Sequence, residues 1–298
     1  MLCAGLSLFL PAGPAAAQDA SVAKQPARPE VPAASAPVDV IYGARYQTDY
    51  RFRGVSQSNR AGSGQTYFEL QLFDNVLYGG FASYKVDLPT RPGAELDITA
   101  GIRPKFGPFT FDLGFVYYLY PAEKQLLDLA GAPLTVRNTD FIEFAGKVAY
   151  APNEELTLGA GVFHTSNFLG THANATFVNG TFKYAFPEGS FGFLPAGFAL
   201  SAEFGHYFLG QTHFTSLGNV KLPDYNTGNV GISYTYKELT LDLRFHDTDL
   251  SKKQCFVFTG DPRGIATGSG RSNWCGDAVV ATLSLDFTGS KGFGIFGD

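Results

Sequence analysis

The sequence predicts an all-β protein, a transmembrane antiparallel up-and-down β-barrel of about twelve strands. Three observations predict this fold. Apolar and polar residues alternate with a period of two from Val38 onward, and the connections between the alternating runs are short and long in turn. After the N-terminal segment, no run reaches the roughly eighteen apolar residues that a membrane-spanning helix needs.

The composition fits strands that have one apolar face and are joined by tight turns. Charged residues make up 16% of the chain, against roughly 25% in soluble domains, whereas aromatic residues reach 15% and glycine occurs 35 times. The formal net charge is -5 and no cluster of Lys or Arg is present, which argues against nucleic acid as a partner.

The chain divides into three predicted segments. Residues 1–17 are apolar and end in an Ala-x-Ala site, which predicts a signal peptide cleaved before Gln18, although the usual basic start is missing. Residues 18–37 are rich in Ala and Pro and predict an extended periplasmic linker. Residues 38–298 form the predicted outer-membrane barrel.

Two cysteines remain once Cys3 leaves with the signal peptide. We expect Cys255 and Cys275 to form a disulfide in the loop before the last strand, because exported proteins mature in an oxidising compartment. Closing a loop of this size contributes on the order of 3 kcal/mol in the chain-entropy model. The alternative is two unrelated free thiols.

Period-two alternation is clearest in the segment 239–246, where Leu239, Leu241 and Leu243 share one face and polar residues occupy the other. The predicted strands are roughly 39–53, 65–74, 77–87, 95–106, 109–120, 139–151, 156–166, 173–185, 197–208, 224–237, 239–249 and 278–288. Very short connections alternate with longer ones, as in transmembrane barrels, with residues 187–196 as a longer exception. A soluble β-sandwich also alternates, but it explains the loop lengths and the signal peptide less well.

The segment Asp49-Tyr-Arg-Phe-Arg-Gly-Val-Ser-Gln57 resembles the amino-terminal motif of the TorF-type putative porin family. The segments Gly64-Gln-Thr-Tyr67 and Leu77-Tyr-Gly-Gly-Phe-Ala-Ser83 are also similar to the next two strands of that family, so the resemblance covers about the first third of the barrel. It implies an exported outer-membrane β-barrel with presumed channel activity.

Few residue clusters are candidates for catalysis or metal binding. His164 and Ser166 lie on the same lipid-facing side of one predicted strand, and Asn167 follows them. A serine with a neighbouring histidine can act as a nucleophile with its base, which leaves a membrane-embedded hydrolase as an alternative. His246, Asp247 and Asp249 lack the spacing of a strong metal motif. No enzymatic activity, metal or cofactor is therefore expected.

Charged residues recur on the face of each strand that lies opposite the apolar face. Burying these charges in hydrocarbon would cost kcal/mol each, so the charged face points into the lumen. The predicted lumen-lining residues are Arg45, Asp49, Arg51, Arg53, Glu69, Asp97, Arg103, Asp112, Glu143, Lys147, Lys183, Glu203, Asp242, Arg244 and Asp286. Arg45, Arg51 and Arg53 form the densest group of like charge. These residues either pair with one another and fill the barrel, or line a water-filled path and set its ionic preference.

The function predicted from these observations is a porin-like channel in the outer membrane of a Gram-negative bacterium, through which small hydrophilic solutes or ions diffuse passively. Twelve strands should leave a narrow pore, between the filled interior of eight strands and the open one of sixteen. Outer-membrane lipid and lipopolysaccharide are the expected surroundings. The alternatives are the embedded hydrolase and a plugged structural or adhesin barrel.

Overall fold

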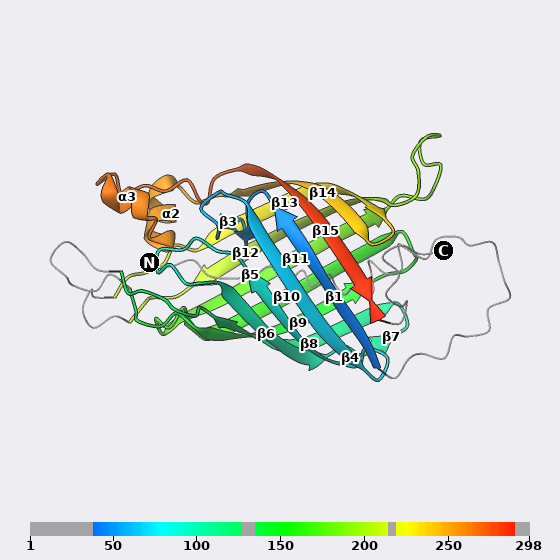
Figure 1. Cartoon of the computed structure of the whole chain (residues 1–298), viewed down its shortest axis with the longest axis horizontal. Coiled ribbons are helices and arrows are strands. Elements are labelled where there is room, and N and C mark those ends of the chain that lie inside the picture. Colours follow the sequence, from blue (N-terminus) through cyan, green and yellow to red (C-terminus); the bar gives the residue numbers. More distant parts are fainter. Residues whose placement is uncertain (1–37, 127–134, 214–218, 290–298) are drawn as a thin grey trace.

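The protein forms a closed antiparallel barrel in a computed structural model that describes residues 38–126, 135–213 and 219–289 (Figure 1). The predicted signal peptide and linker lie outside the described residues. One sheet contains thirteen strands, and the pairing of β6 with β8 closes it. Because β7 has only two residues, twelve long strands make the wall, as predicted.

Each wall strand pairs with its neighbours in the chain, and the first pairs with the last. The wall strands are β1 (Val38–Gln47), β4 (Ser63–Leu72), β5 (Leu77–Tyr84), β6 (Glu95–Ile102), β8 (Phe109–Leu119), β9 (Phe141–Tyr150), β10 (Leu156–Phe168), β11 (Ala173–Ala185), β12 (Phe198–Leu209), β13 (Tyr225–Tyr236), β14 (Leu239–Thr248) and β15 (Ala278–Thr288). The short strands are β2 (Arg51–Phe52), β3 (Val55–Ser56) and β7 (Lys105–Phe106), and the helices are α2 (Lys252–Thr259) and α3 (Pro262–Ala266).

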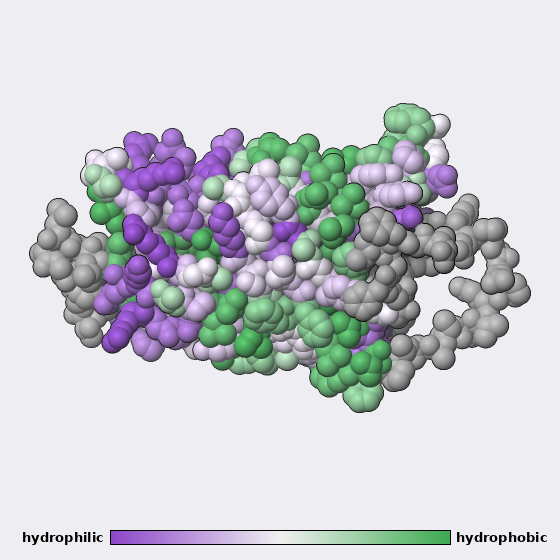
Figure 2. Space-filling view, viewed as in Figure 1, coloured by the Kyte–Doolittle hydropathy of each residue, from purple (hydrophilic) through white to green (hydrophobic). Residues whose placement is uncertain are grey.

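The two faces of the wall differ in polarity, as a membrane barrel requires. Along β14 the side chains alternate between exposed leucines and less exposed polar residues, and Leu241 pairs in register with Leu283 of β15 and Tyr234 of β13. Figure 2 shows hydrophobic residues along the flank of the barrel, whereas hydrophilic residues gather at the end that carries α2 and α3. No helix in the described ranges is long and apolar enough to span a bilayer.

The two ends of the barrel carry different connections. Ile41 of β1 pairs with Thr288 of β15, so the wall begins and finishes at the same end, which we call the turn end. The opposite end, called the loop end, carries α2 and α3 (Figure 1). The connection at residues 187–196 projects from the turn end, and a bridge between Ser190 and Leu194 closes it on itself, so it adds no wall strand.

The prediction for the first strand is wrong at its C-terminal end. The predicted strand ran from residue 39 to 53, but β1 ends at Gln47, and the next residues form the separate hairpin β2–β3. The chain bends at Thr48 and Asp49, directly after β1, and the residues of the hairpin that follows are buried. Ten of the other predicted strands each coincide with one observed strand, with ends that differ by three residues or fewer, whereas the predicted strand 95–106 covers both β6 and β7.

The longest described loop, between β14 and β15, is partly helical, which the sequence analysis did not predict. Ser251 caps α2 through a capping box with Gln254, and Gly260 ends the helix in the left-handed conformation. The predicted disulfide between Cys255 and Cys275 is confirmed, and it ties α2 to the chain just before β15 at the loop end.

Candidate functional site in the barrel lumen

The hairpin β2–β3 enters the lumen from the loop end and is buried along its whole length. Residues 49–58, which we call the inner hairpin, all have buried side chains or backbone. Phe52 pairs with Val55 across a two-residue turn in which Arg53 and Gly54 both have positive φ, at 45° and 82°. Such a turn matches the twist of paired strands. Glycine is needed at the second position, because a Cβ there would lie 2.3 Å from Oγ1 of Thr227.

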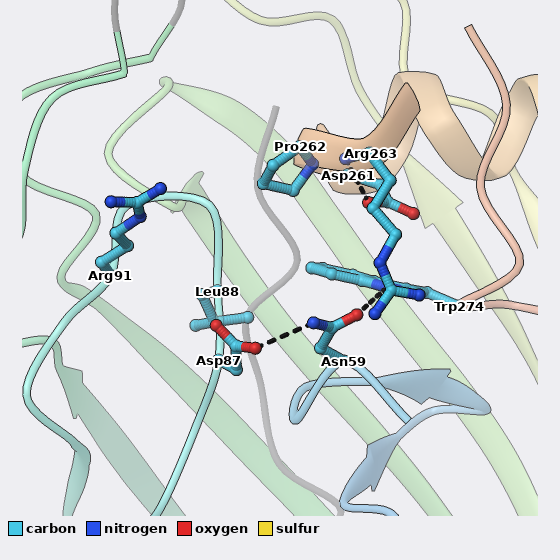
Figure 3. Close-up of a pocket in the computed structure, with 8 residues that line it drawn as sticks. All are labelled: Asn59, Asp87, Leu88, Arg91, Asp261, Pro262, Arg263 and Trp274. Atoms are coloured by element: carbon cyan, nitrogen blue, oxygen red, sulfur yellow. Dashed lines mark hydrogen bonds between the residues drawn. The ribbon is translucent and has the colours of Figure 1, made fainter. Parts of the chain in front are cut away.

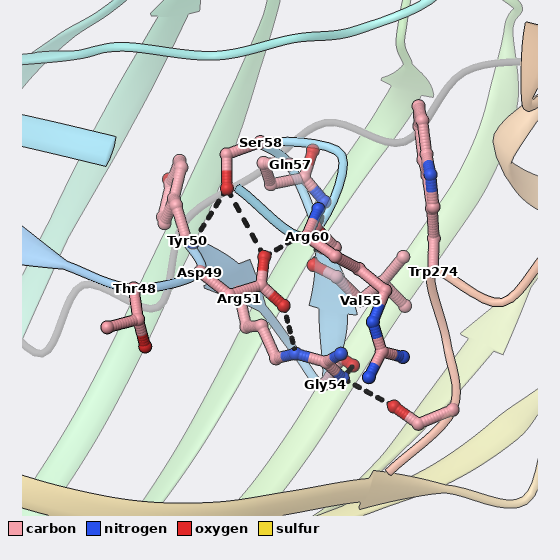
Figure 4. A network of polar contacts seen from close by, with 12 residues as sticks. Thr48, Asp49, Tyr50, Arg51, Gly54, Val55, Gln57, Ser58, Arg60 and Trp274 are labelled. Carbon is pink, nitrogen blue, oxygen red and sulfur yellow. Dashed lines mark hydrogen bonds and ion pairs between the residues drawn. The ribbon is translucent and has the colours of Figure 1, made fainter. Parts of the chain in front are cut away.

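A polar network holds the inner hairpin in its fold (Figure 4). The Asp49 carboxylate accepts from Nε of Arg51 at 2.8 Å and from Oγ of Ser56 at 2.6 Å. Arg51 also donates to the carbonyl of Gly276 at 2.7 Å, which joins the inner hairpin to the disulfide-bonded loop. Burial lowers the pKa of Arg51 despite the neighbouring Asp49, and Asp49 and Gly276 supply acceptors for its buried guanidinium.

Arg53, at the tip of the turn, reaches the far wall of the barrel. Its guanidinium donates to both oxygens of Glu143 on β9, at 2.9 and 2.8 Å, and its carbonyl accepts from the hydroxyl of Tyr225 on β13. Burial alone would lower the pKa of Arg53, but Glu143 more than offsets it, so the group stays charged. The aromatic rings that lie within 5.2 Å of the guanidinium carbon belong to Phe52, Phe163, Phe177 and Tyr207.

Two further carboxylates lie on the inward face of β6. Glu95 accepts from the hydroxyls of Tyr50 at 2.6 Å and Tyr120 at 2.9 Å. Burial raises the pKa of both tyrosines well above the usual range, so they are neutral donors. Asp97 is fully buried, and neither of its oxygens has a hydrogen-bond partner among the described residues.

A second ionic cluster crosses neighbouring strands toward the turn end. Arg103 donates to Glu69 at 3.1 Å and to Asp112 at 3.2 Å. Lys147 of β9 lies 2.9 Å from the same Asp112 oxygen, and Tyr78 donates to its other oxygen at 2.8 Å. Four predicted lumen residues therefore neutralise one another on β4, β8, β9 and the end of β6.

The wall formed by β12 to β14 carries a third set of charges. Arg244 donates to Asp242 at 2.9 Å, to Asn229 at 2.7 Å and to Ser201 at 2.6 Å. Glu203 accepts from Asn179 at 2.9 Å. This set contains more neutral amide and hydroxyl partners than the other two clusters.

Water reaches the two sides of the lumen unequally. The paired Arg53 and Glu143 side chains are 2% and 1% exposed, whereas Arg244 and Asp242 are 20% and 19% exposed. Arg45 and Asp286, 3.7 Å apart where β1 meets β15, are 21% and 38% exposed. Lys183 of β11 is also half-buried rather than buried. The inner hairpin contacts residues of β9 to β14, and the charged side chains that keep contact with water are Arg45, Lys147, Asp242, Arg244 and Asp286.

The fold separates Arg45, Arg51 and Arg53, which the sequence placed together as the densest group of like charge facing the lumen. Only Arg45 stands on β1, whereas Arg51 and Arg53 belong to the inner hairpin and are held in buried ion pairs. The analysis of the sequence also missed Tyr50, whose hydroxyl bonds to the lumen wall. The sequence contained a signal for this contact, because a buried tyrosine in an otherwise polar segment needs a hydrogen-bond partner for its hydroxyl.

The other two candidate clusters are placed on the outer or loop-end parts of strands. Nδ1 of His164 lies 2.8 Å from Oγ1 of Thr176 on the neighbouring strand, and the contact is exposed on the outer face. Asp249 accepts from the amide of Asn226 at 2.6 Å. Among the described residues, no group of three or more His, Cys, Asp or Glu residues has the geometry to hold a metal ion.

A model of one protein family matches residues 32–284, and that family is described as bacterial protein of unknown function (Gcw_chp). The chain belongs to the Gcw_chp family. No curated protein matches this Gcw_chp member. Its predicted relationship to the TorF-type family stays a prediction, because these findings do not bear on it.

Several solved structures are similar to the Gcw_chp member at low sequence identity. The KdgM porin shares 9% identity with a TM-score of 0.45, over 84% of this chain and 98% of KdgM. The outer membrane protein OpdK from Pseudomonas aeruginosa shares 13% identity with a TM-score of 0.38, over 76% of this chain and 58% of OpdK. OccAB4 from Acinetobacter baumannii shares 12% identity with a TM-score of 0.37, over 83% of this chain and 56% of OccAB4.

Proposed function

We propose that this Gcw_chp member is an outer-membrane channel for the passive diffusion of small hydrophilic solutes or ions. The observation that carries the proposal is the unequal filling of the lumen. Arg45, Asp242, Arg244 and Asp286 keep contact with water inside a closed barrel whose outer face is apolar.

The orientation follows from the two ends of the barrel. Outer-membrane barrels have short turns in the periplasm and longer loops outside, so the loop end with α2, α3 and the disulfide faces the cell exterior. The apolar flank contacts outer-membrane lipid, and lipopolysaccharide surrounds the loop end. A Gram-negative envelope and an N-terminal signal peptide belong to the same proposal.

The path for solutes runs beside the inner hairpin rather than through the centre of the barrel. Half-buried cations along this path, apart from Lys147 that Asp112 neutralises, are Arg45, Lys183 and Arg244, and the half-buried carboxylates among the predicted lumen residues are Asp242 and Asp286. This excess of cations favours entry of anions over cations, because a charge in a narrow, low-dielectric path raises the local concentration of its counter-ion.

The inner hairpin also favours a second candidate function, the plugged barrel, because it occupies much of the loop half of the lumen. Liposome swelling separates the two functions. Vesicles that contain the full chain should swell in neutral monosaccharides and swell more slowly in trisaccharides, because a narrow path excludes the larger solute. Swelling no faster than that of protein-free vesicles, with protein that is folded and inserted, would support the plugged barrel instead.

A variant without the hairpin tip provides the matched control. Replacing residues 51–56 with two glycines should remove the contacts to Glu143 and widen the path, so trisaccharides should then enter as well. If this variant and the wild type both exclude every sugar, the lumen is blocked by something other than the inner hairpin, and the proposed path is wrong.

A further inference from the structure

Among the described turns at the turn end, the connection between β11 and β12 is the longest, and it is poor in charge. Residues 187–196, which we call the aromatic loop, contain one ionisable side chain, that of Glu188. The shorter turns at the same end carry Asp74, Lys105, Glu154 and Lys237. Charged side chains keep a turn in water, so the aromatic loop differs from its neighbours in the surroundings that its composition suits.

Two phenylalanines of the aromatic loop are the most exposed large hydrophobic side chains in the described part of the chain. Phe193 is 78% exposed and Phe191 is 76% exposed. A single exposed apolar side chain is ordinary, but a group of them that extends a larger apolar surface marks a site of contact with a protein or a membrane. What the two rings extend therefore decides the partner.

A row of aromatic rings joins the aromatic loop to the apolar flank of the barrel. Tyr184, near the end of β11, lies on the same face of that strand as the exposed Phe182. The ring centre of Phe186 lies 5.3 Å from that of Tyr184 and 5.9 Å from that of Phe191. Figure 2 shows hydrophobic residues at the tip of the loop, at the upper right. The lipid-facing surface of the wall thus continues into the loop.

The backbone of the aromatic loop makes many of its hydrogen bonds within the loop. The amide of Gly189 donates to Leu194 at 2.8 Å, and the amide of Leu194 donates to Ser190 at 3.0 Å. The amide of Gly192 donates to Gly189 at 2.8 Å, and the hydroxyl of Ser190 donates to Pro187 at 2.6 Å. Backbone groups without partners are costly away from water, so this internal pairing suits a loop that leaves the aqueous phase.

The aromatic loop also points away from the lumen. Figure 1 shows it at the upper right, where it bends away from the barrel axis so that its tip lies outside the outline of the wall. A loop that continued along the axis would carry its rings into the aqueous space beyond the barrel. The outward bend instead holds Phe191 and Phe193 beside the end of the apolar flank.

We propose that the aromatic loop anchors the barrel in the phospholipid leaflet at the turn end, with the rings of Phe191 and Phe193 at the boundary between headgroups and acyl chains. Membrane barrels carry aromatic girdles at this depth, and apolar groups bind there in proportion to the area that they bury. The anchor goes beyond the proposed channel function, because it requires a barrel in a membrane but not an open lumen.

Quenching of tryptophan fluorescence by brominated lipids tests the depth of the loop. The single tryptophan, Trp274, is buried at the opposite end, where its Nε1 donates to Asn59 (Figure 3), so the wild type supplies the background emission. Phe193→Trp adds an indole at the tip of the aromatic loop. Its added emission should fall at least about twofold in phosphatidylcholine vesicles with bromines near the headgroup end of the acyl chains, and less with bromines near the methyl end.

Two control variants mark water and the membrane interior. Glu154→Trp, on the exposed turn between β9 and β10 at the same end, should be quenched little by either lipid. Leu243→Trp, on the exposed apolar flank of β14, should be quenched most by bromines near the methyl end, which checks insertion of the barrel independently of the loop. Phe191→Trp repeats the test if Phe193→Trp does not fold.

Quenching of Phe193→Trp and Phe191→Trp no stronger than that of Glu154→Trp would overturn the anchor. If Leu243→Trp is quenched normally in that experiment, the membrane barrel stands and the loop is open to a periplasmic protein. Quenching that appears only when the protein is diluted in lipid would show that a second copy of the chain covers the loop, and would overturn the anchor as well. Loss of quenching at Leu243→Trp in folded protein would contradict the membrane barrel itself.

Discussion

The guanidinium of Arg53 meets both carboxylate oxygens of Glu143, at 2.9 and 2.8 Å, across ninety residues of sequence. One partner sits at the tip of the inner hairpin and the other on β9, and both side chains are almost inaccessible to water. This contact fixes how deeply the inner hairpin enters the lumen, and therefore how much of the path it occupies.

Removing one member of this pair should be costly. Arg53→Met should lower the free energy of unfolding by about 3–5 kcal/mol, because Glu143 is then left as a buried and unpaired charge. Urea titration of the detergent-solubilised barrel, followed by tryptophan fluorescence, measures the loss. The double variant R53M/E143L carries neither charge and should recover much of the stability. Additive losses in the double variant would contradict the pairing.

The turn of the inner hairpin should depend on Gly54 more than other turns depend on their glycines. Gly54→Ala combines a φ of 82° with a Cβ that would meet Thr227 and Thr248, at 2.3 and 2.5 Å. We expect a loss of about 2 kcal/mol or more, from backbone strain and from overpacking. Gly107→Ala is the matched control, since its φ is also positive at 57° but nothing lies within 4 Å. Equal losses at the two sites, in the same urea titration, would argue against close packing of the hairpin tip.

The alternation of β14 was sufficient to predict which residues face lipid, because a strand has only two faces and only one tolerates charge. The inner hairpin could not be separated from β1 in the same way. Arg51 and Arg53 continue the period-two pattern of Arg45, and only the Arg53-Gly54 pair marks the turn. An arginine with positive φ is rare, and here it is stabilised by Glu143 and the surrounding rings, which are brought near only when the barrel closes.

The alternation of faces along the strands also predicted that Glu69, Arg103 and Asp112 face inward. It did not predict that they form one cluster. The partner of an inward side chain depends on which strands are neighbours and on their stagger. That information appears only in the closed sheet, where β6 pairs with β8. The outward bend of the aromatic loop was likewise beyond reach, because the sequence pattern specifies the faces of strands and not the paths of the connections between them.

A charged substitution on the outer face of β14 should destabilise the barrel more than the same substitution on its inner face. Leu241→Arg places a cation on the exposed apolar flank of β14 and should destabilise the inserted barrel by about 2–4 kcal/mol. Thr240→Arg, one residue earlier on the lumen side near Asp242, should cost much less. Urea unfolding in lipid vesicles compares the two variants, and equal stability would mean that the assignment of faces, and hence the membrane barrel, is wrong.

Ion preference should be set by the water-accessible cations rather than by those of the inner hairpin. Arg244→Ser should move the reversal potential in a KCl gradient toward cation preference, because it removes a half-exposed positive charge and leaves Asp242 without its partner. Arg45→Ser should act in the same direction. A larger shift from Arg53→Ser than from Arg244→Ser, measured on channels that have folded and inserted, would show that the path runs past the tip of the inner hairpin.

The most direct test of the proposed channel is the single-channel conductance of the full chain in a planar bilayer. The account predicts discrete conductance steps for the wild type, and larger steps when residues 51–56 are replaced by two glycines, because the inner hairpin narrows the path without closing it. The absence of steps from folded, inserted wild-type protein, together with steps from the shortened variant, would contradict the channel and identify a plugged barrel.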